Sequence, residues 1–360
     1  MKRKLVAALL VAAAGWLAFG GWTLWRRAPR STPPPGELRG AWHVHTTRSD
    51  GLGSIDDVVR AAKGAGLQFV VVSDHNVVTP AEAGYRDGVL VVQATEISSA
   101  FGHVVAVGLP SAPRAAEKAD PLGRTAAAGG LAVLAHPLHP RRPFTGWGKG
   151  AWRGFEVVSN DSFWHQALRD RAAGRILLAA LALPFDEPQA VLWLSRFPSE
   201  ELARFDAEAA AARAARRPPP VLLCSADAHG YPSYGAAFGA FSMHVPVTLT
   251  GDAGADSRAV LDALLDGRAA CVYDGVAPAS SVRLTRVPGA GLYLSLEAPS
   301  RGDVRLRLLR DGQEVEALSP SALPGSAVRF CEGGCAPGTY RVEGTVDGRP
   351  WLFTNPVAFE

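Results

Sequence analysis

The chain lacks the sequence signatures of several large enzyme classes. It contains no G-x-S-x-G nucleophile elbow, no phosphate-binding P-loop and no G-x-G-x-x-G dinucleotide fingerprint. Acyl-enzyme, nucleoside triphosphatase and oxidoreductase mechanisms therefore have no support from motifs. No segment recurs with a period of roughly 20–50 residues, which argues against a repeat architecture.

Outside the N-terminus the chain also lacks an excess of positive charge. The net charge of the whole chain is +3, but residues 1–30 hold six of the 37 lysines and arginines and no acidic residue. The remaining residues carry 31 basic and 34 acidic side chains, a net charge of −3. Because this part has no basic stripe and no interleaved aromatic residues, we expect no binding to nucleic acid.

Only four cysteines are present. Cys331 and Cys335 are close enough in sequence to bridge across a glycine turn, and an exported location would permit the bond. We expect a disulfide between these two, with free thiols as the alternative. Cys224 and Cys271 lie in apolar runs, where we expect them to be buried as small hydrophobic side chains.

A long segment without charge follows the basic amino terminus. Residues 5–25 contain no charged side chain, and about 20 helical residues span the roughly 30 Å hydrocarbon core of a bilayer. Residues 23–26, TLWR, do not resemble a small-residue cleavage site, so we expect residues 1–27 to be an uncleaved, single-pass membrane anchor. A cleaved signal peptide of a secreted or periplasmic protein is the alternative. The amino-terminal charges favour an N-inside orientation, with the rest of the chain outside the cytoplasm.

The most informative side chains are six of the nine histidines and three carboxylates, which follow apolar, strand-like runs. In chain order they are His43, His45, Asp50, His75, Glu96, His103, His136, Asp227 and His229. Burying such groups without partners costs roughly 2–7 kcal/mol each, and divalent cations satisfy imidazole nitrogens and carboxylate oxygens together. The spacing of two residues within His43/His45 and Asp227/His229 points both members of each pair to one face of a strand. The pattern therefore predicts a metal site at the carboxyl ends of barrel strands.

These segments resemble the PHP family, the metal-dependent hydrolases named after polymerase and histidinol phosphatase. The matching segments lie between about residues 38 and 230 and are HVHTTRSDG, SDHN, ATEIS, the isolated His103, AHP and SADAH. The resemblance implies the α/β fold class, with a distorted, TIM-like barrel of seven (β/α) units. It also implies two or three divalent metal ions, for which Zn, Mn and Fe suit the mixed nitrogen and oxygen ligands equally.

The same resemblance distributes the ligands over three ions. The first ion would take His43, His45, Glu96 and Asp227. Glu96 would bridge to a second ion held by His103 and His136, and a third ion would take Asp50, His75 and His229. Some relatives have histidine at the position of Asp50. We assign Glu96, Asp227 and His229 to catalysis itself.

Further residues are assigned from their neighbours in sequence. Asp74 precedes His75 and is expected to orient that imidazole or to cap a turn. Arg141, Arg142 and Lys149 follow His136 and are candidate phosphate-binding residues, although a solvated basic loop explains them equally well. The remaining three histidines are interpreted as surface or packing residues: His139, His165 and His244. Asn76, Asn160 and Asp161 either line the mouth of the site or form turns.

Composition and the pattern of apolar residues divide the chain into four predicted parts. Residues 1–27 are the anchor, and the proline-rich residues 28–37 form an extended linker. Residues 38–280 are the barrel, beginning with a helix over 55–64 and strands over 69–73 and 89–96. Residues 163–217 are mainly helical, and their apolar run 176–185 is too short to cross a bilayer, so it packs on the barrel or forms a lid. Residues 281–360 alternate apolar and polar residues between turns, which predicts a β-sandwich-like module or a β extension of the barrel.

The implied chemistry is hydrolysis by a hydroxide that bridges two metal ions. Most PHP proteins act on phosphoesters, so we expect a small-molecule phosphoester substrate. The anchor and the C-terminal β module resemble the CehA/McbA branch of the family, some of whose members are implicated in hydrolysing carbamates or amides. A carbamate, amide or carboxyl-ester hydrolase is therefore one alternative. A non-catalytic cell-envelope binding protein that retains its metal site is another.

Overall fold

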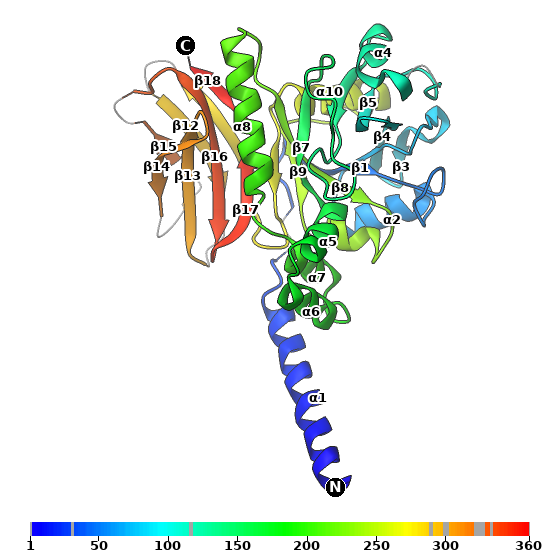
Figure 1. Cartoon of the computed structure of the whole chain (residues 1–360), viewed down its shortest axis with the longest axis vertical. Helices are drawn as coiled ribbons and strands as arrows, with labels where there is room; N and C mark the ends of the chain where they lie inside the picture. The colour runs from blue at the N-terminus through cyan, green and yellow to red at the C-terminus, as the bar shows by residue number, and fades with distance from the viewer. Residues whose placement is uncertain are drawn as a thin grey trace.

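The computed structural model describes residues 2–29, 32–114, 118–287, 291–297, 302–319, 328–331 and 334–359. Figure 1 shows a long N-terminal helix that projects from a larger body. In the body, a barrel with surrounding helices lies on one side of helix α8 (Ser199–Ala214), and antiparallel strands lie on the other.

Seven strands close the barrel. Their order around the ring is β1-β2-β4-β5-β6-β7-β8, and β8 pairs with β1 to complete it. Strand β5 is antiparallel to both of its neighbours, and the other pairs are parallel. The strands are β1 (Leu38–Val44), β2 (Phe69–Val72), β4 (Val89–Ser99), β5 (Gly102–Val107), β6 (Leu131–Leu134), β7 (Gly154–Ser159) and β8 (Val221–Ala228). The predicted seven-stranded α/β barrel is confirmed, with one strand reversed.

Local capping signals define the first helix of the barrel, α2 (Ile55–Ala65). The Ser54 hydroxyl accepts a hydrogen bond from the Asp57 N–H, and the Asp57 carboxylate accepts one from the Ser54 N–H. The helix ends at Gly66, whose φ of 78° is favourable for glycine. These signals stand in the sequence itself, which is why the predicted bounds of this helix differ from the observed ones by a single residue.

The connections on the barrel are mostly short. A small antiparallel strand, β3, pairs with β4 after a 3₁₀ turn, η1. The bounds of these elements and of the shorter helices are η1 (Pro80–Glu82), β3 (Gly84–Arg86), α4 (Pro121–Ala127), α9 (Tyr234–Phe238) and α10 (Ala253–Leu265).

One connection is long. Between β7 and β8 the chain forms α5 (Asn160–Arg169), α6 (Ala173–Ala182), α7 (Glu187–Leu194) and then α8. In Figure 1, α5, α6 and α7 lie at the end of the body from which the N-terminal helix projects. That helix, α1 (Lys2–Trp25), is the one described helix that is long and apolar enough to cross a membrane, as judged by length and composition.

The C-terminal strands form two antiparallel sheets. The first continues outward from the barrel strand β1 in the order β9-β10-β17-β16-β13-β14, with β18 also paired to β16, and the second has the order β11-β12-β15. Leu294, Leu308 and Trp351 are among the apolar side chains buried between them. The strands are β9 (Ser242–Val245), β10 (Ala270–Val272), β11 (Ser280–Val287), β12 (Gly291–Glu297), β13 (Val304–Arg310), β14 (Gln313–Leu318), β15 (Val328–Phe330), β16 (Gly338–Val346), β17 (Arg349–Thr354) and β18 (Val357–Phe359). A C-terminal antiparallel module is thus present, and its first sheet is continuous with the barrel.

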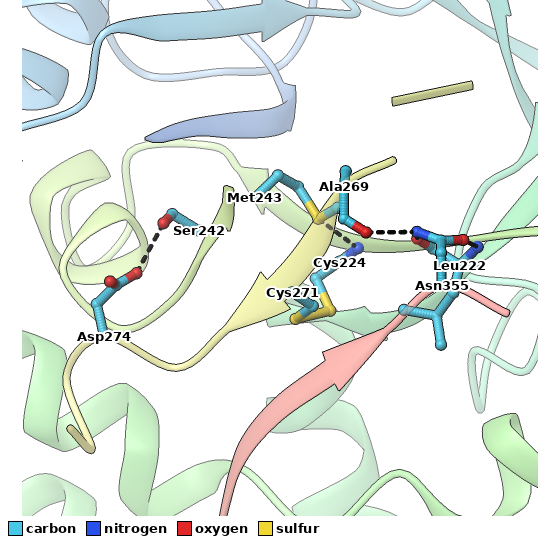
Figure 2. The surroundings of a disulfide bond; sticks show 8 residues. All are labelled: Leu222, Cys224, Ser242, Met243, Ala269, Cys271, Asp274 and Asn355. Atoms are coloured by element: carbon cyan, nitrogen blue, oxygen red, sulfur yellow. Dashed lines mark hydrogen bonds between the residues drawn. A yellow bond between two sulfur atoms is a disulfide. The ribbon is translucent and has the colours of Figure 1, made fainter. Parts of the chain in front are cut away.

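The disulfide differs from the expected one. The sulfur atoms of Cys224 in β8 and Cys271 in β10 are bonded, and the two Cα atoms are 5.8 Å apart. Figure 2 shows this bond beside Met243 of β9. Cys331 and Cys335 have free thiols, and burial raises the pKa of Cys331 to about 12. The predicted Cys331–Cys335 disulfide is therefore wrong, because closeness in sequence does not determine which strands pack together and hold two cysteines at bonding distance.

Candidate metal centre

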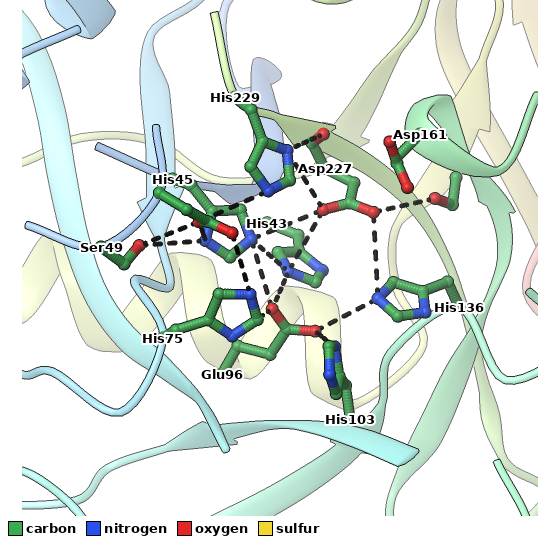
Figure 3. Close-up of polar contacts among 12 residues, drawn as sticks. His43, His45, Ser49, His75, Glu96, His103, His136, Asp161, Asp227 and His229 are labelled. Atoms are coloured by element: carbon green, nitrogen blue, oxygen red, sulfur yellow. Dashed lines mark hydrogen bonds and ion pairs between the residues drawn. The ribbon is translucent and has the colours of Figure 1, made fainter. Parts of the chain in front are cut away.

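The nine predicted ligands converge at one end of the barrel. Figure 3 labels all of them except Asp50, whose oxygens lie 3.5 Å from nitrogens of the other ligands His45, His75 and His229. His43 lies one residue before the end of β1 and His45 just beyond that end, His75 and His136 follow β2 and β6, and Asp227 lies near the end of β8. His103 comes near the start of its strand, β5. Because β5 is reversed, its beginning lies beside the carboxyl ends of the parallel strands, so His103 meets the others there.

Four of the side chains form a tight group around one point. The His43 and His45 Nε2 atoms are 3.0 Å apart, and they lie 3.2 and 3.3 Å from Glu96 Oε2. Asp227 Oδ1 lies 3.7 Å from the first nitrogen and 3.5 Å from the second. Ligand atoms about 2.0–2.1 Å from a tetrahedral ion are separated by about 3.3 Å, so this group has the dimensions of a first cation site.

The other oxygen of Glu96 faces a second group. Glu96 Oε1 lies 2.8 Å from His103 Nδ1 and 3.2 Å from His136 Nε2. Asp227 also reaches both groups, since its Oδ2 atom is 3.9 Å from the same His136 nitrogen. The Glu96 carboxylate is therefore placed to bridge two neighbouring cations.

A third group lies toward the solvent. Asp50 Oδ1 is 3.5 Å from His229 Nε2 and 3.5 Å from His45 Nδ1, and Asp50 Oδ2 is 3.5 Å from His75 Nε2. These four residues place one potential ligand atom each within 4.8 Å of one another. Asp50 is half exposed, so this group is the most open of the three.

The donor atoms themselves fit a bound cation. The Nδ1 atom of His103 is buried and makes no hydrogen bond of acceptable geometry, although Glu96 Oε1 is only 2.8 Å away. A nitrogen and an oxygen that lie close together without pointing at each other are expected where both point at a common ion. The clusters of imidazole nitrogens and carboxylate oxygens thus fit divalent metal ions.

The pKa values of the histidines in the centre are shifted by burial and by the neighbouring carboxylates. Burial lowers the pKa of His43, but the negative charges of Glu156, Glu96 and Asp227 outweigh this effect and raise it well above its usual value. Burial likewise lowers the pKa of His136, and its hydrogen bond to Glu96 overcomes this and raises the pKa to about 9. Burial dominates at His75 and lowers its pKa to about 4. Without metal, the imidazoles of His43 and His136 therefore favour the protonated form, whose positive charge offsets the buried carboxylates as a cation would.

Backbone strain is concentrated at the centre. His43, His136 and Asp227 have φ values of 66°, 28° and 39°, in the region that favours glycine. Such conformations cost about 1–3 kcal/mol each and persist where the surrounding structure fixes them, often at functional sites. Three strained residues within one polar cluster support a functional interpretation of the cluster.

One important residue is missed by sequence reasoning. Glu156, in the middle of β7, is buried and lies between two predicted ligands. Its Oε1 atom is 2.8 Å from His43 Nδ1 and accepts a hydrogen bond from the Trp42 indole, while Oε2 accepts one from the His136 backbone N–H. A carboxylate that accepts from the far nitrogen of a ligand histidine fixes its tautomer and orientation. The available signal was a single glutamate inside the apolar run GFEVVS.

Asp74 supports the loop that carries Asp50. Its carboxylate accepts hydrogen bonds from the Thr46 N–H, the Thr46 hydroxyl and the Ser49 hydroxyl. From the sequence, Asp74 is expected either to orient His75 or to cap a turn. Its hydrogen bonds agree with the second role, because they hold residues 46–49, between His45 and Asp50, in place.

A pocket of about 410 Å³ opens above the three groups. Arg141 and Arg142 line it, whereas Lys149 lies over the Phe101 ring, outside the residues that line the pocket. Asn160 and Asp161 are also part of the lining, and Asn76 is not. The interpretation of two histidines as surface or packing residues needs revision, because His139 and His165 line this pocket on either side of Asp161.

The third histidine outside the pattern lies away from the pocket. His244 in β9 is buried, with Nδ1 3.0 Å from a Glu37 oxygen and Nε2 3.1 Å from an Asp274 oxygen. Burial lowers its pKa, but the two carboxylates outweigh this and raise it. It ties the linker to the turn that follows β10, which agrees with a packing role.

Comparison with known proteins found similar solved structures at low sequence identity. A two-domain protein from Bacteroides vulgatus that contains a predicted PHP-like metal-dependent phosphoesterase is 14% identical, with a TM-score of 0.43 over 91% of this chain and 99% of that one. A proposed metal-dependent phosphoesterase from Bifidobacterium adolescentis is 16% identical, with a TM-score of 0.31 over 55% and 89% of the two chains. An amidohydrolase from Chromobacterium violaceum with bound sulfate is 16% identical, with a TM-score of 0.28 over 38% and 84%.

The structural neighbours thus include PHP-like proteins. No family model matches the sequence, and no curated protein matches it. The interpretation of the centre therefore rests on its own geometry.

Proposed function

We propose that this protein is a metal-dependent hydrolase that acts on phosphoesters. The observation that carries the proposal is the position of Glu96, whose two oxygens lie 2.8–3.3 Å from nitrogens of five different histidines. A single buried carboxylate surrounded by imidazoles on both sides is suited to join two cations. Adjacent divalent cations acidify water and stabilise the oxygens of an in-line displacement.

The side chains of the pocket would perform the remaining tasks. Arg141 and Arg142 would bind the non-reacting phosphoryl oxygens by charge-assisted hydrogen bonds. Glu156 would keep His43 in one tautomer and orientation. Asp227, near the end of β8, would fix the spacing between the two inner groups, because its two oxygens face different histidines.

The N-terminal helix is proposed to be a membrane anchor. Its 24 residues include a span without charge that is long enough for the hydrocarbon core, and only two of them are buried against the body. With the N-inside orientation, the pocket would lie outside the cytoplasm, on a protein held at the cell membrane. N-terminal sequencing of the mature protein tests this, and a first residue beyond position 25 would contradict it.

The enzymatic proposal is tested with the purified full-length protein. Elemental analysis after reconstitution is expected to find two or three ions per chain. Turnover with Zn, Mn or Fe is then compared across phosphomonoesters, phosphodiesters, carboxyl esters and carbamates. Faster turnover of carbamates or carboxyl esters than of any phosphoester would favour the CehA-type alternative. Metal binding without turnover of any substrate would favour a binding protein.

A further inference from the structure

The body of the protein contacts α1 within the apolar part of that helix. The Trp16 indole donates a hydrogen bond to the Leu181 carbonyl at the end of α6. An added Cβ at Gly20 would collide with the Phe185 ring, so glycine is needed for the observed approach. The Trp22 ring lies 6.1 Å from that of Trp193 in α7. Figure 1 shows α6 and α7 beside the upper part of α1.

These contacts fix the depth of α6 if α1 spans a bilayer. The uncharged segment ends at Trp25, and a helix rises 1.5 Å per residue, so Trp16 lies about 14 Å and Gly20 about 8 Å inside that end. Amphipathic helices at membrane surfaces are buried about 5–10 Å deep. Phe185, which contacts Gly20, is therefore held at the depth of an interfacial helix, and Leu181, which contacts Trp16, lies a few ångströms deeper.

The composition of α6 suits that position. From Ile176, after Arg175 in its first turn, α6 and the three residues that follow it read ILLAALALPF, residues 176–185, and contain no charged side chain. Leu177 is 59% exposed and Leu183 is 36% exposed, although both are large and apolar. Of the ten exposed large apolar residues that the described part of the chain has outside α1, four lie between residues 164 and 183. Leu177 belongs to α6, the helix that contacts α1, and Leu183 directly follows it, so this part of the exposed apolar surface lies next to that of α1.

A backbone carbonyl group at the end of α6 also has a hydrogen-bond partner. The last carbonyl groups of a helix have no partner within the helix, and in a hydrocarbon environment each would be costly. The Trp16 indole satisfies the Leu181 carbonyl in this position. The next polar groups are at the level of the α1 terminus, where Arg27 forms an ion pair with Asp186 at 2.5 Å.

The same helices form a wall of the candidate metal pocket. Val191 and Leu194 of α7 line the pocket, whereas Trp193 on the opposite face of α7 contacts Trp22 of α1. A single helix, about 10 Å thick, therefore separates the pocket from α1. Trp164 of α5, 45% exposed, adds to this apolar wall, and the basic lining comes instead from the loop after β6.

We propose that α6 lies in the outer interface of the membrane beside α1, and that the pocket takes phosphoesters carried by membrane lipids. The substrate part of this inference rests on the proposed phosphoesterase function, and the position of α6 does not. An amphiphilic phosphoester fits this pocket. Its phosphoryl group would contact Arg141, Arg142 and the three ligand groups, and its hydrocarbon chain would pack along the apolar side chains of α5 and α7.

The position of α6 is tested in vesicles of phosphatidylcholine and phosphatidylglycerol. Leu177→Cys carries an environment-sensitive dye on the full-length chain, in a background with serine at positions 331 and 335. The control site is Leu131→Cys, because Leu131 is similarly exposed, 46%, and begins β6. We expect a blue-shifted emission that shallow doxyl lipids quench at position 177 and neither effect at position 131. Equal behaviour of the two sites would overturn the proposed position.

A pair of glycines in α1 provides the matched control for the contact itself. Gly20 faces Phe185, whereas a Cβ at Gly21 would meet no atom within 4 Å. Gly20→Leu and Gly21→Leu add the same side chain to the same helix. We expect Gly20→Leu to reduce the quenching of the dye at position 177 and Gly21→Leu to leave it unchanged. Identical quenching in both variants would show that the Gly20 contact does not hold α6 in place.

The substrate class is tested with two diesters that share a leaving group, methyl and hexadecyl 4-nitrophenyl phosphate. We expect a higher kcat/KM for the hexadecyl ester in vesicles, and loss of this preference in Gly20→Leu without a change for the methyl ester. Equal kcat/KM for the two esters would overturn the lipid-borne substrate. If neither ester is hydrolysed, the proposed phosphoesterase function fails, and the dye at position 177 still decides where α6 lies.

Discussion

Replacing Glu156 by glutamine tests whether the centre depends on a residue outside the predicted ligand set. The glutamate accepts from three donors: the His43 ring, the Trp42 indole and the His136 backbone N–H. Glutamine has one acceptor oxygen and one donor NH₂ group. If its oxygen faces His43 and Trp42, its NH₂ group faces the His136 N–H. If it is flipped, the NH₂ group opposes two donors instead.

At least one buried donor is therefore left without a partner in Glu156→Gln. Such a loss costs about 1–3 kcal/mol, which corresponds to roughly 5- to 150-fold in an equilibrium constant. Groups that orient metal-bound histidines typically contribute about 10–100-fold to metal affinity or activity. We therefore expect metal affinity to fall by about 10–100-fold, with a parallel loss of kcat/KM.

Competition with a chelator of known affinity measures this change in the full-length protein. The matched control is Glu201→Gln, which alters another buried carboxylate, one whose hydrogen bonds and ion pair are with Gln166 and Arg196 and not with the nine clustered residues. The control is expected to lower thermal stability without changing metal affinity. Unchanged affinity in Glu156→Gln, or an equal loss in both variants, would refute the orienting role of Glu156.

Three further outcomes are expected. Glu96→Gln should lose metal and reduce hydrolysis by at least about 10²-fold, because ligands that act as a unit give non-additive losses; near-normal metal content by elemental analysis would contradict the bridging assignment. Because the pKa of His136 is raised to about 9, its protonated form stabilises the metal-free chain below about pH 6.5, and this stabilisation is lost as the pH rises through 9. Metal must displace that proton, so calorimetric titration should show affinity rising with pH up to about 9, with proton release. Peptide mapping without reduction should recover the Cys224–Cys271 pair, and Cys224→Ser should lower stability by about 2–5 kcal/mol; recovery of Cys224 and Cys271 as free thiols would contradict this pairing.

Several features could be predicted from sequence because their signals are local. The capping pair Ser54 and Asp57 marks the start of α2, and the uncharged residues 5–25 mark α1. The nine polar residues after apolar runs could be grouped because a closed barrel gathers its strand ends at one place. Their roles as ligands, the domain boundary at residue 281 and the CehA/McbA assignment remain predictions.

Other features depend on contacts between residues far apart in sequence. Glu156 and His43 are 113 residues apart, and only the closure of the ring through β7, β8 and β1 places one against the other. Cys224 and Cys271 meet because β8 and β10 pack together, a proximity that sequence separation does not encode.

The sequence alone determined the kind of chemistry, because residue type decides which atoms can bind a cation and apolar periodicity decides which segments are buried. The tertiary structure alone decided which groups orient those atoms and what surrounds them. Glu156, the wall formed by α7 and the contact between Gly20 and Phe185 all depend on packing between distant segments. Such packing is selected by the free energy of the whole fold, and no short stretch of sequence carries a signal for it.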